Sequence, residues 1–334
     1  MEQTKPILEI KDLSIEYCAN KRVVKAVNHL DLCIEKGESV GLVGETGAGK
    51  TTTALGVMGL IPNPPGVIRS GEILFEGEDL LKLSAKKMRQ IRSKKIAMIF
   101  QDPMTSLNPV MTVGDQIAES YRIHDKLSRA EAAVKAKDML ELVGIPAERY
   151  GEYPHQFSGG MKQRVVIAMA LSCNPKLLIA DEPTTALDVT IQAQVLELMK
   201  KLKAEYRMSM IMITHDLGVV AEVCDKVAVL YAGNIVEYGA MEDVFDDPRH
   251  PYTRALFDAT PTLDGEKHKL NIIKGFSPDP IHLPGGCAFH PRCKEVCDKC
   301  SAVMPEMVEV APGHLVRCVH AVPCGAEKTE EVAE

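Results

Sequence analysis

The segment GETGAGKT at residues 44–51 has the residue types and spacing of a phosphate-binding loop. It fits the pattern G-x-x-x-x-G-K-[ST] and lies between a predicted strand and a predicted helix, which argues against an accidental glycine-rich turn. Glycines let the backbone N–H groups point at phosphate oxygens, Lys50 adds a cation, and the Thr51 hydroxyl can ligate Mg²⁺. The predicted nucleotide contacts are Gly44, Glu45, Thr46, Gly47, Ala48, Gly49, Lys50, Thr51 and Thr52.

The apolar run LLIADEP at residues 177–183 contains an acidic pair, Asp181 and Glu182. Ligands of open α/β sheets bind at the carboxyl ends of the strands, so both side chains are expected beside the phosphate-binding loop. Asp181 is placed to bind Mg²⁺ through water, and Glu182 to orient and polarise an attacking water. An acidic pair alone is usually just solvated, so only its combination with the upstream loop predicts nucleotide hydrolysis.

A Ser-Gly-Gly turn, formed by Ser158, Gly159 and Gly160 in FSGGMKQRV, opens a predicted helix upstream of the acidic pair. Its N–H groups and the positive end of the helix dipole suit a phosphate. Read alone, the turn could equally be a flexible helix cap. Its combination with the two sites above and with the segments TTALD (184–188) and MITHD (212–216) is far more specific.

Six of the ten cysteines lie after residue 286 in a polar, proline-rich part of the chain. Thiolates grouped in this way favour zinc or iron–sulfur coordination. The spacing Cys293-x3-Cys297-x2-Cys300 suits either, so it leaves both open. The six are Cys287, Cys293, Cys297, Cys300, Cys318 and Cys324, while the scattered Cys18, Cys33, Cys173 and Cys224 are expected to be small apolar core residues.

The elements that must position these residues change in type near residue 40. Residues 7–40 alternate short β-like runs with turn signals, which predicts antiparallel strands that end at the Lys36-Gly37 turn. From SVGLVG (39–44) onward, apolar strand candidates alternate with helical segments, the pattern of a mainly parallel α/β sheet. The segment YAGNIVEYG predicts a hairpin with its turn at Gly233-Asn234, after which the α/β pattern ends.

Two predicted helices carry apolar stripes that are expected to face the core. One begins at Ser128, forms a capping box with Glu131 and stops at Gly144. The other covers residues 190–206. The stripe of the first is Val134, Met139, Leu140 and Val143, and that of the second is Ile191, Val195, Leu198 and Leu202.

The composition and the N-terminal sequence restrict the cell compartment and the binding partners that are expected for the chain. Its 334 residues are 46% hydrophobic, which allows a substantial core, and its net charge of −7 argues against non-specific affinity for nucleic acid. The start MEQTKPILEIKDLS has acidic residues where a signal peptide needs a basic head, and no stretch approaches the roughly 20 apolar residues of a membrane span. We therefore expect a cytosolic chain, without disulfides, that reaches membranes only through partners.

Together these motifs resemble those of the ATP-binding cassette (ABC) ATPases over roughly residues 6–245. The resemblance implies an α/β P-loop NTPase fold, the ABC cassette, with an antiparallel β subdomain, a helical subdomain at about 105–172 and a small Cys-rich C-terminal extension. We expect the ATPase domain over 1–250, the extension over 251–325 and a disordered tail over 326–334. One departure is that the usual Leu-Ser-Gly-Gly-Gln reads Phe-Ser-Gly-Gly-Met here, which keeps the phosphate-facing residues.

The resemblance also implies roles for single residues. Tyr17 would stack on adenine, Gln101 would read the γ-phosphate and Mg²⁺, and His215 would contact the γ-phosphate; taken singly, Tyr17 and His215 could be ordinary partly buried residues. Head-to-tail dimers are implied, in which the Ser-Gly-Gly turn of one subunit completes the ATP site of the other and Asp188 lines the interface. Such a split site makes hydrolysis conditional on dimer closure.

The segments QDPMTSLNPVMTVGDQI (101–117) and DDPRHPYTRALFDATP (246–261) are similar to those of ATPase subunits of dipeptide, oligopeptide and nickel importers. This implies a peripheral subunit at the cytoplasmic face of the membrane. Its implied partners are two transmembrane permease subunits, a second ATPase subunit and, indirectly, an extracytoplasmic solute-binding protein. Peptide import is the first expectation and nickel or another solute the second. A soluble ABC protein acting on ribosomes or DNA is the alternative of another class, disfavoured by the single cassette and acidic charge.

The segments GCAFHPRC (286–293) and GHLVRC (313–318), with Cys300, are similar to the C-terminal region of peptide-importer ATPases, some of which hold a [4Fe–4S] cluster. The resemblance implies Cys287, Cys293, Cys300 and Cys318 as its ligands. Cys297 lies outside this pattern, and zinc is the alternative metal. A cluster of this kind would staple a small extension that lacks a large core.

Overall fold

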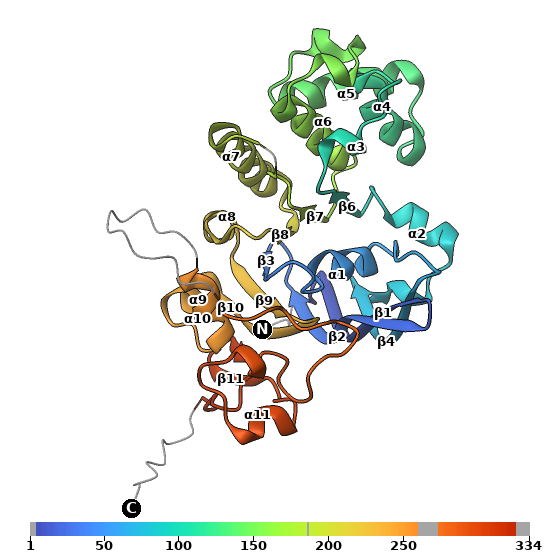
Figure 1. The fold of residues 1–334 in the computed structure, drawn as a ribbon. Helices are drawn as coiled ribbons and strands as arrows, with labels where there is room; N and C mark the ends of the chain where they lie inside the picture. Colours follow the sequence, from blue (N-terminus) through green and yellow to red (C-terminus); the bar gives the residue numbers. More distant parts are fainter. Residues whose placement is uncertain (1–4, 186, 260–272, 325–334) are drawn as a thin grey trace, which may run out of the picture.

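The computed structural model describes residues 5–185, 187–259 and 273–324, and it contains two β-sheets with helices around the larger one (Figure 1). The tail expected to be disordered, 326–334, lies outside the described residues. So do residues 260–272 of the expected extension.

The first sheet is antiparallel, with strand order β2-β1-β4-β5. Leu8 pairs with Ile34 and Ala19 with Arg22, so the first two strands form a long hairpin, and a turn follows at residues 36–37. The antiparallel prediction for residues 7–40 is therefore confirmed. The strands are β1 (Leu8–Ala19), β2 (Arg22–Ile34), β4 (Gly66–Phe75) and β5 (Glu78–Asp79).

The second sheet has the order β11-β12-β10-β9-β3-β8-β7-β6, and its five strands from β9 to β6 are parallel. β9 and β10 form the predicted hairpin, but its turn is Ala232-Gly233, one residue earlier than expected. The strands are β3 (Ser39–Val43), β6 (Ile96–Ile99), β7 (Leu177–Asp181), β8 (Ser209–Ile213), β9 (Lys226–Tyr231), β10 (Asn234–Ala240), β11 (Val308–Ala311) and β12 (His314–Val316).

The parallel strands are buried on both faces, which explains their continuous apolar sequence. Successive side chains of a strand point to opposite faces of the sheet, so one strand contributes residues to two hydrophobic clusters. Ile211 and Ile213 of β8 pack toward the antiparallel sheet and α1, while Met210 and Met212 pack toward the helices of the other face. The sheet is thus packed between two hydrophobic layers.

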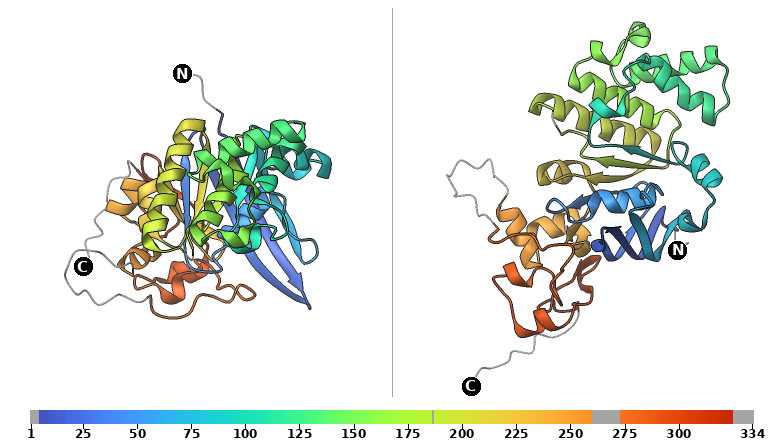
Figure 2. Two further views of the ribbon diagram at one scale, coloured as in Figure 1. Left: turned by 90° about the horizontal axis from the view of Figure 1, so that it is seen from above. Right: turned by 45° about the vertical axis from the view of Figure 1, so that its right-hand side comes forward.

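Helices α4, α5 and α6 gather at one end of the molecule, away from the antiparallel sheet (Figures 1 and 2). In the described part of the chain, no helix combines the length and apolar character needed to cross a bilayer. The helices are α1 (Lys50–Val57), α2 (Ala85–Ile91), α3 (Pro103–Ser106), α4 (Val113–His124), α5 (Arg129–Leu142), α6 (Gly159–Leu171), α7 (Val189–Tyr206), α8 (Leu217–Val223), α9 (Met241–Asp246), α10 (Pro251–Asp258) and α11 (Asp298–Ala302), with short 3₁₀ turns at Leu80–Lys82, Ala147–Gly151, Pro154–Gln156 and His290–Arg292.

The predicted start of α5 is confirmed, because Ser128 and Glu131 form both hydrogen bonds of a capping box. One stripe residue is wrong: Val134 is 59% exposed. The buried residues of this helix include Ala132 and Ala136, and a residue midway between two positions four apart points to the opposite side. The stripe of α7 is confirmed, with Val195 and Leu202 buried and its other two members half-buried.

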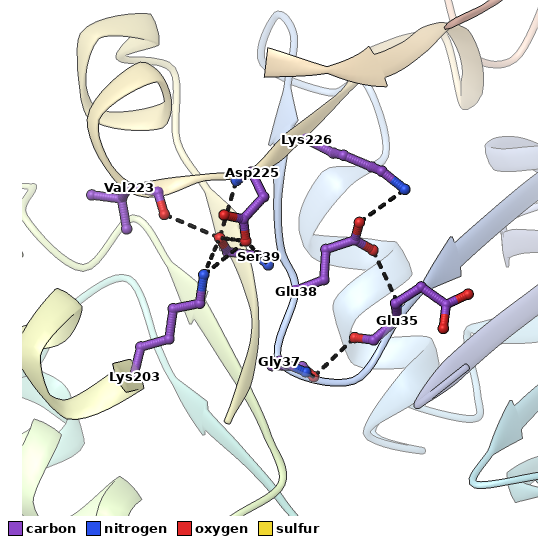
Figure 3. Close-up of polar contacts among 9 residues, drawn as sticks. Glu35, Gly37, Glu38, Ser39, Lys203, Val223, Asp225 and Lys226 are labelled. Carbon is purple, nitrogen blue, oxygen red and sulfur yellow. Dashed lines mark hydrogen bonds and ion pairs between the residues drawn. The ribbon is translucent and has the colours of Figure 1, made fainter. Parts of the chain in front are cut away.

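Polar side chains tie α7 to the amino ends of β3 and β9 (Figure 3). The Asp225 carboxylate accepts hydrogen bonds from the Ser39 N–H and hydroxyl, at 2.7 and 2.6 Å, and from the Lys203 ammonium at 2.8 Å. Lys226 and Glu38 form a neighbouring ion pair at 2.8 Å. This cluster fixes the sheet at the end opposite to the carboxyl ends of its parallel strands, where ligands are expected.

The C-terminal segment continues the main sheet. Strand β12 pairs with β10, matching Leu315 with Tyr238, and β11 covers its other edge. Ala288 and Phe289 are buried in the same hydrophobic cluster as the helices. The described part of the extension therefore shares a sheet and a core with the preceding chain.

Candidate functional site

The phosphate-binding loop connects β3 to α1, as predicted. Three of its glycines have positive φ angles: 145° at Gly44, 81° at Gly47 and 102° at Gly49. A Cβ atom at Gly44 would lie 2.2 Å from the Leu230 carbonyl oxygen, and one at Gly49 would lie 2.5 Å from that of Ala26. Glycine is therefore required at both positions by conformation and by space.

Lys50 is held over the loop by the loop itself. Its ammonium donates to the carbonyl oxygens of Gly44 at 2.7 Å and Glu45 at 3.1 Å. Burial lowers the pKa of Lys50, although the charges of Glu182, Asp181 and Glu45 act in the opposite direction. A buried ammonium is well suited to bind an anion, because little hydration is lost when a phosphate approaches it.

Thr51 and Asp181 meet across the sheet edge, with the hydroxyl 3.2 Å from the carboxylate oxygen Oδ1. Thr51 is the second residue of α1, and Asp181 is the last residue of β7. A hydroxyl and a carboxylate at this distance are oxygen ligands of the kind that Mg²⁺ prefers. Thr52, also predicted as a nucleotide contact, lies in the first turn of α1 and is half-buried.

Glu182 is surrounded by the other predicted catalytic residues. Its carboxylate accepts from the Gln101 amide at 2.8 Å and lies 3.3 Å from Nδ1 of His215; Thr185 donates to it at 2.9 Å. Gln101, Glu182 and His215 follow the neighbouring strands β6, β7 and β8, so the parallel sheet brings them together. Glu182 also has a left-handed φ of 47°, a backbone strain of the type found at functional sites.

The two acidic residues have different electrostatic surroundings. Burial raises the pKa of Asp181, and the charge of Glu182 adds to this increase, although Thr51 and Lys50 oppose it. Burial also acts on Glu182, but hydrogen bonds from Thr185, His215 and Gln101 outweigh it and lower its pKa. Glu182 is therefore a carboxylate at neutral pH, as a group that polarises water must be.

Tyr17 lies on β1 and lines a hollow together with Ala19, Asn20, Arg22, Val24 and Ile281. It is half-buried, so its ring is partly available. Ile281 belongs to the C-terminal extension, and the Pro280 carbonyl accepts a hydrogen bond from the Lys25 N–H of β2 at 3.0 Å. The sequence did not indicate that the extension approaches this hollow.

The Ser-Gly-Gly turn lies beside the start of α7. Ser158 caps α6, and a Cβ at Gly160 would lie 2.4 Å from Ile191, while Gly159 lies near Leu187. Asp188 caps α7 by accepting the Ile191 N–H at 2.9 Å. Ser158, Gly160 and Asp188 therefore have structural roles within the chain. The contact of the turn and Asp188 with nucleotide on a second subunit stays a prediction.

Sequence reasoning missed the residues that hold Glu45 from behind the loop. The Arg292 guanidinium donates to both Glu45 carboxylate oxygens, at 2.8 and 3.0 Å, and Ser277 donates to the same carboxylate. The Glu45 N–H donates to the Tyr252 hydroxyl at 3.0 Å. These partners follow Glu45 by more than 200 positions, so no local sequence pattern could reveal them.

The cysteines of the extension are free thiols. Burial raises the pKa of Cys287 to about 11, and the thiols of Cys318, Cys300 and Cys293 contribute to the increase. Burial likewise raises the pKa of Cys318, with a contribution from Cys300. These thiols are therefore near enough for their charges to interact, but in the described part of the chain the group whose ligand atoms lie within 4.8 Å of one another is a different one.

A second arrangement includes Cys297. Its Sγ lies 3.5 Å from that of Cys300, and ligand atoms of Cys297, Cys300 and His320 lie within 4.8 Å of one another. Among the scattered cysteines, Cys224 is buried, but Cys33 is exposed. The prediction that Cys33 is a core residue is wrong, because it points outward between the buried Leu32 and Ile34 of β2.

Comparison with known proteins agrees with this architecture. Residues 27–185 match the family model described as ABC transporter, and residues 236–300 match that of the oligopeptide/dipeptide transporter C-terminal region. The oligopeptide transport ATP-binding protein AppD of Bacillus subtilis is 49% identical over 97% of this chain and 99% of its own length. OppD of the same organism is 52% identical over 93% of this chain and 88% of its length.

Solved structures share the cassette. A dimeric ATP-binding cassette in a post-hydrolysis state, bound to ADP and Pi, is 26% identical, covers 70% of this chain and 98% of its own, and has a TM-score of 0.64. The protein cbiO1 from Clostridium perfringens is 28% identical over 73% of this chain and 92% of its own, with a TM-score of 0.62. This chain belongs to the family of ABC transporter ATP-binding proteins, in the group that carries the oligopeptide/dipeptide transporter C-terminal region.

Proposed function

We propose that this chain is the ATP-hydrolysing subunit of an importer for di- or oligopeptides. The main observation in favour of hydrolysis is that Gln101 and His215 both contact the carboxylate of Glu182. The preceding residue, Asp181, lies beside the Thr51 hydroxyl. Peptide as the solute is supported by the names of the relatives, which include oligopeptide transport ATP-binding proteins of Bacillus subtilis and Haemophilus influenzae.

In this proposal the loop N–H groups of residues 44–51 and the Lys50 ammonium bind the ATP phosphates. Thr51, Asp181 and Gln101 would hold Mg²⁺, which neutralises charge that develops on the transferred phosphoryl group. Glu182 orients and polarises the attacking water, and His215 faces the γ-phosphate. Tyr17 stacks on the adenine.

A second ATPase subunit, identical or similar, completes each site. Ser158, Gly159 and Gly160 of one subunit face the phosphates bound to the other, with Asp188 at the interface. The exposed positions of Ser158 and Asp188 are compatible with this role. Closure of the dimer on ATP drives two transmembrane permease subunits, and an extracytoplasmic solute-binding protein delivers the peptide. The chain accordingly works as a peripheral subunit at the cytoplasmic face of the membrane.

The extension is proposed to hold a [4Fe–4S] cluster on Cys287, Cys293, Cys300 and Cys318, with zinc as the alternative. The mutual influence of these four thiols supports the set, and four thiolates are the usual donors of such a cluster. The cluster would supply a covalent cross-link for the extension, and we assign it no step in hydrolysis.

The test combines hydrolysis with uptake. Purified wild-type chain should hydrolyse ATP, while Glu182→Gln should bind ATP and lose about 100-fold or more in kcat, because the charge that polarises water is gone. In the host, deletion of the gene should abolish uptake of a labelled tripeptide, and the wild-type gene, but not Glu182→Gln, should restore it. Loss of nickel uptake with normal tripeptide uptake would favour the second solute, and co-purification with ribosomes or DNA would favour the soluble class.

A further inference from the structure

The phosphate-binding loop is held at Glu45 by residues that follow the cassette motifs in the sequence. Glu45, the second residue of the loop, is bound at its carboxylate by Arg292 and Ser277 and at its N–H by Tyr252. The two Arg292 bonds are parallel and charge-assisted, at 2.8 and 3.0 Å. Bidentate pairs of this kind fix direction as well as distance.

Arg292 is itself fixed before it reaches Glu45. Its side chain is only 6% exposed, and it donates to the Tyr231 hydroxyl at 3.2 Å and to the Lys274 carbonyl at 3.1 Å. Phe289, three residues earlier, packs edge-on against Tyr231, with the ring centres 5.2 Å apart. Because the Arg292 side chain is already ordered, it loses little conformational entropy when it binds Glu45.

Because Arg292 fixes Glu45, Glu45 in turn restricts the position of Lys50 and of the loop backbone. Its carbonyl oxygen accepts from the Lys50 ammonium at 3.1 Å and from the Ala48 N–H at 3.1 Å. Three glycines with positive φ make the loop intrinsically adaptable. A fixed point at Glu45 therefore decides how the loop N–H groups and Lys50 are oriented.

We propose that Arg292 is a positioning residue for ATP binding, which acts through Glu45 on the phosphate-binding loop and so links the Cys-rich extension to the nucleotide site. This inference rests on the proposed function, since it assigns ATP to the loop. Arg292 precedes Cys293, one of the proposed cluster ligands, so the fold of the cysteine segment sets the position of the guanidinium.

The expected effect falls on affinity rather than turnover. Loop N–H groups contact phosphates in the ground state and in the transition state alike, so disordering them weakens both by a similar factor. The KM for ATP should rise while kcat stays within about twofold. If Arg292 had a purely structural role, its substitution would instead lower the unfolding temperature of the chain or the fraction of active protein. A smaller active fraction lowers the apparent kcat and leaves KM unaltered.

The test uses the full chain and a fluorescent ATP analogue. Arg292→Gln should raise its Kd about tenfold, a change of the size expected for a lost charge-assisted pair. Arg292→Lys should give an intermediate Kd, because an ammonium keeps the positive charge but cannot form the two parallel hydrogen bonds of the guanidinium. Arg249→Gln is the matched control: it removes an exposed arginine that pairs with Asp247 beside α10, and its Kd should equal that of wild type.

Glu45→Gln tests the same link from the cassette side and leaves the extension sequence intact. It should raise Kd as Arg292→Gln does, and the double variant should be no weaker than either single variant, because both remove one interaction. Unchanged Kd in Glu45→Gln and Arg292→Gln, with wild type binding normally, would overturn this inference alone. A wild-type chain that binds no ATP would overturn the proposed function together with it.

Discussion

His314 and Glu237 form a hydrogen bond between neighbouring strands of the main sheet, with Nε2 of the imidazole 2.8 Å from the carboxylate oxygen Oε1. The side chain of Glu237 is fully buried, and it also accepts from the N–H groups of Arg249 and His250, at 2.7 and 2.9 Å. One carboxylate therefore joins β12 of the extension, β10 of the hairpin and the start of α10.

Glu237→Gln is expected to destabilise the chain by about 1–3 kcal/mol. The amide NH₂ that replaces one carboxylate oxygen would face hydrogen-bond donors, and the pairing with His314 would weaken. The wild-type contacts are strong enough to lower the pKa of Glu237 although burial alone would raise it. Thermal unfolding measures the loss, and Glu197→Gln on the exposed face of α7, where the side chain is 76% exposed, is the control. Equal midpoints for the two variants would contradict the prediction.

The sequence predicted what local patterns encode. The glycines of the loop, the capping box of α5 and the strand that delivers Asp181 and Glu182 each depend on neighbouring residues, and all three are present. For Gln101 and His215 only the resemblance to ABC ATPases implied a role, at the γ-phosphate; their contacts with Glu182 were not predicted, and they arise because the carboxyl ends of parallel strands meet at one edge.

The contacts between the extension and the cassette could not be predicted. Arg292 and Glu45 are 247 positions apart, and β12 has three residues, too few for a periodic pattern. Such pairings depend on the tertiary packing of the whole chain rather than on propensity. For the same reason the sequence misplaced Cys33 and Val134, since apolar character alone does not tell which face of an element is buried.

His250 should make stability depend on pH between about 4 and 6.5. Burial lowers its pKa to about 4, whereas an unfolded histidine titrates near about 6.5. Within this window the unfolded chain binds a proton that the native chain does not, so stability is complete above the unfolded pKa and falls as pH decreases. The slope attributable to one proton is about 1.4 kcal/mol per pH unit.

His250→Asn isolates this contribution. In the wild type Nδ1 of His250 accepts the Tyr252 N–H at 3.0 Å, and an asparagine at a helix N-cap can accept the same bond. Urea unfolding of both proteins between pH 5 and 6.5 should show a shallower pH dependence for the variant. Parallel curves would mean that folding does not lower the pKa of His250. Glu237 does not interfere, because its lowered pKa places its titration below the ordinary glutamate value of about 4.3.

Thr51→Val should raise the Mg²⁺ concentration that hydrolysis requires. It should leave the affinity for nucleotide in the absence of metal unchanged. The hydroxyl lies 3.2 Å from Asp181, and valine keeps the shape of the side chain but offers no oxygen. We expect the Mg²⁺ concentration for half-maximal hydrolysis to rise by about tenfold or more. Binding of the fluorescent ATP analogue in the presence of a chelator should match wild type, since the loop N–H groups and Lys50 are unchanged. A wild-type Mg²⁺ profile would remove Thr51 from the metal site.

The two cysteine sets can be separated by substitution and metal analysis of protein purified without oxygen. If Cys287, Cys293, Cys300 and Cys318 hold an iron–sulfur cluster, Cys287→Ser should lose iron and sulfide. Cys297→Ser should then keep both and show the same brown absorption as wild type. If the site is instead zinc on Cys297, Cys300 and His320, Cys297→Ser should lose the metal and Cys287→Ser should keep it. Cys33→Ser, on the exposed face of β2, is the control for both.

If the extension holds the proposed cluster, its loss should also weaken ATP binding. A metal that only stapled the extension would leave ATP affinity unaltered in Cys287→Ser. The Arg292 contact with Glu45 predicts a second effect, because Arg292 lies in the segment between Cys287 and Cys293. Cys287→Ser should therefore raise the Kd of the ATP analogue, and adding Arg292→Gln to it should cause little further loss. A normal Kd in metal-free Cys287→Ser would show that Arg292 is held by its contacts with Tyr231 and Lys274 alone.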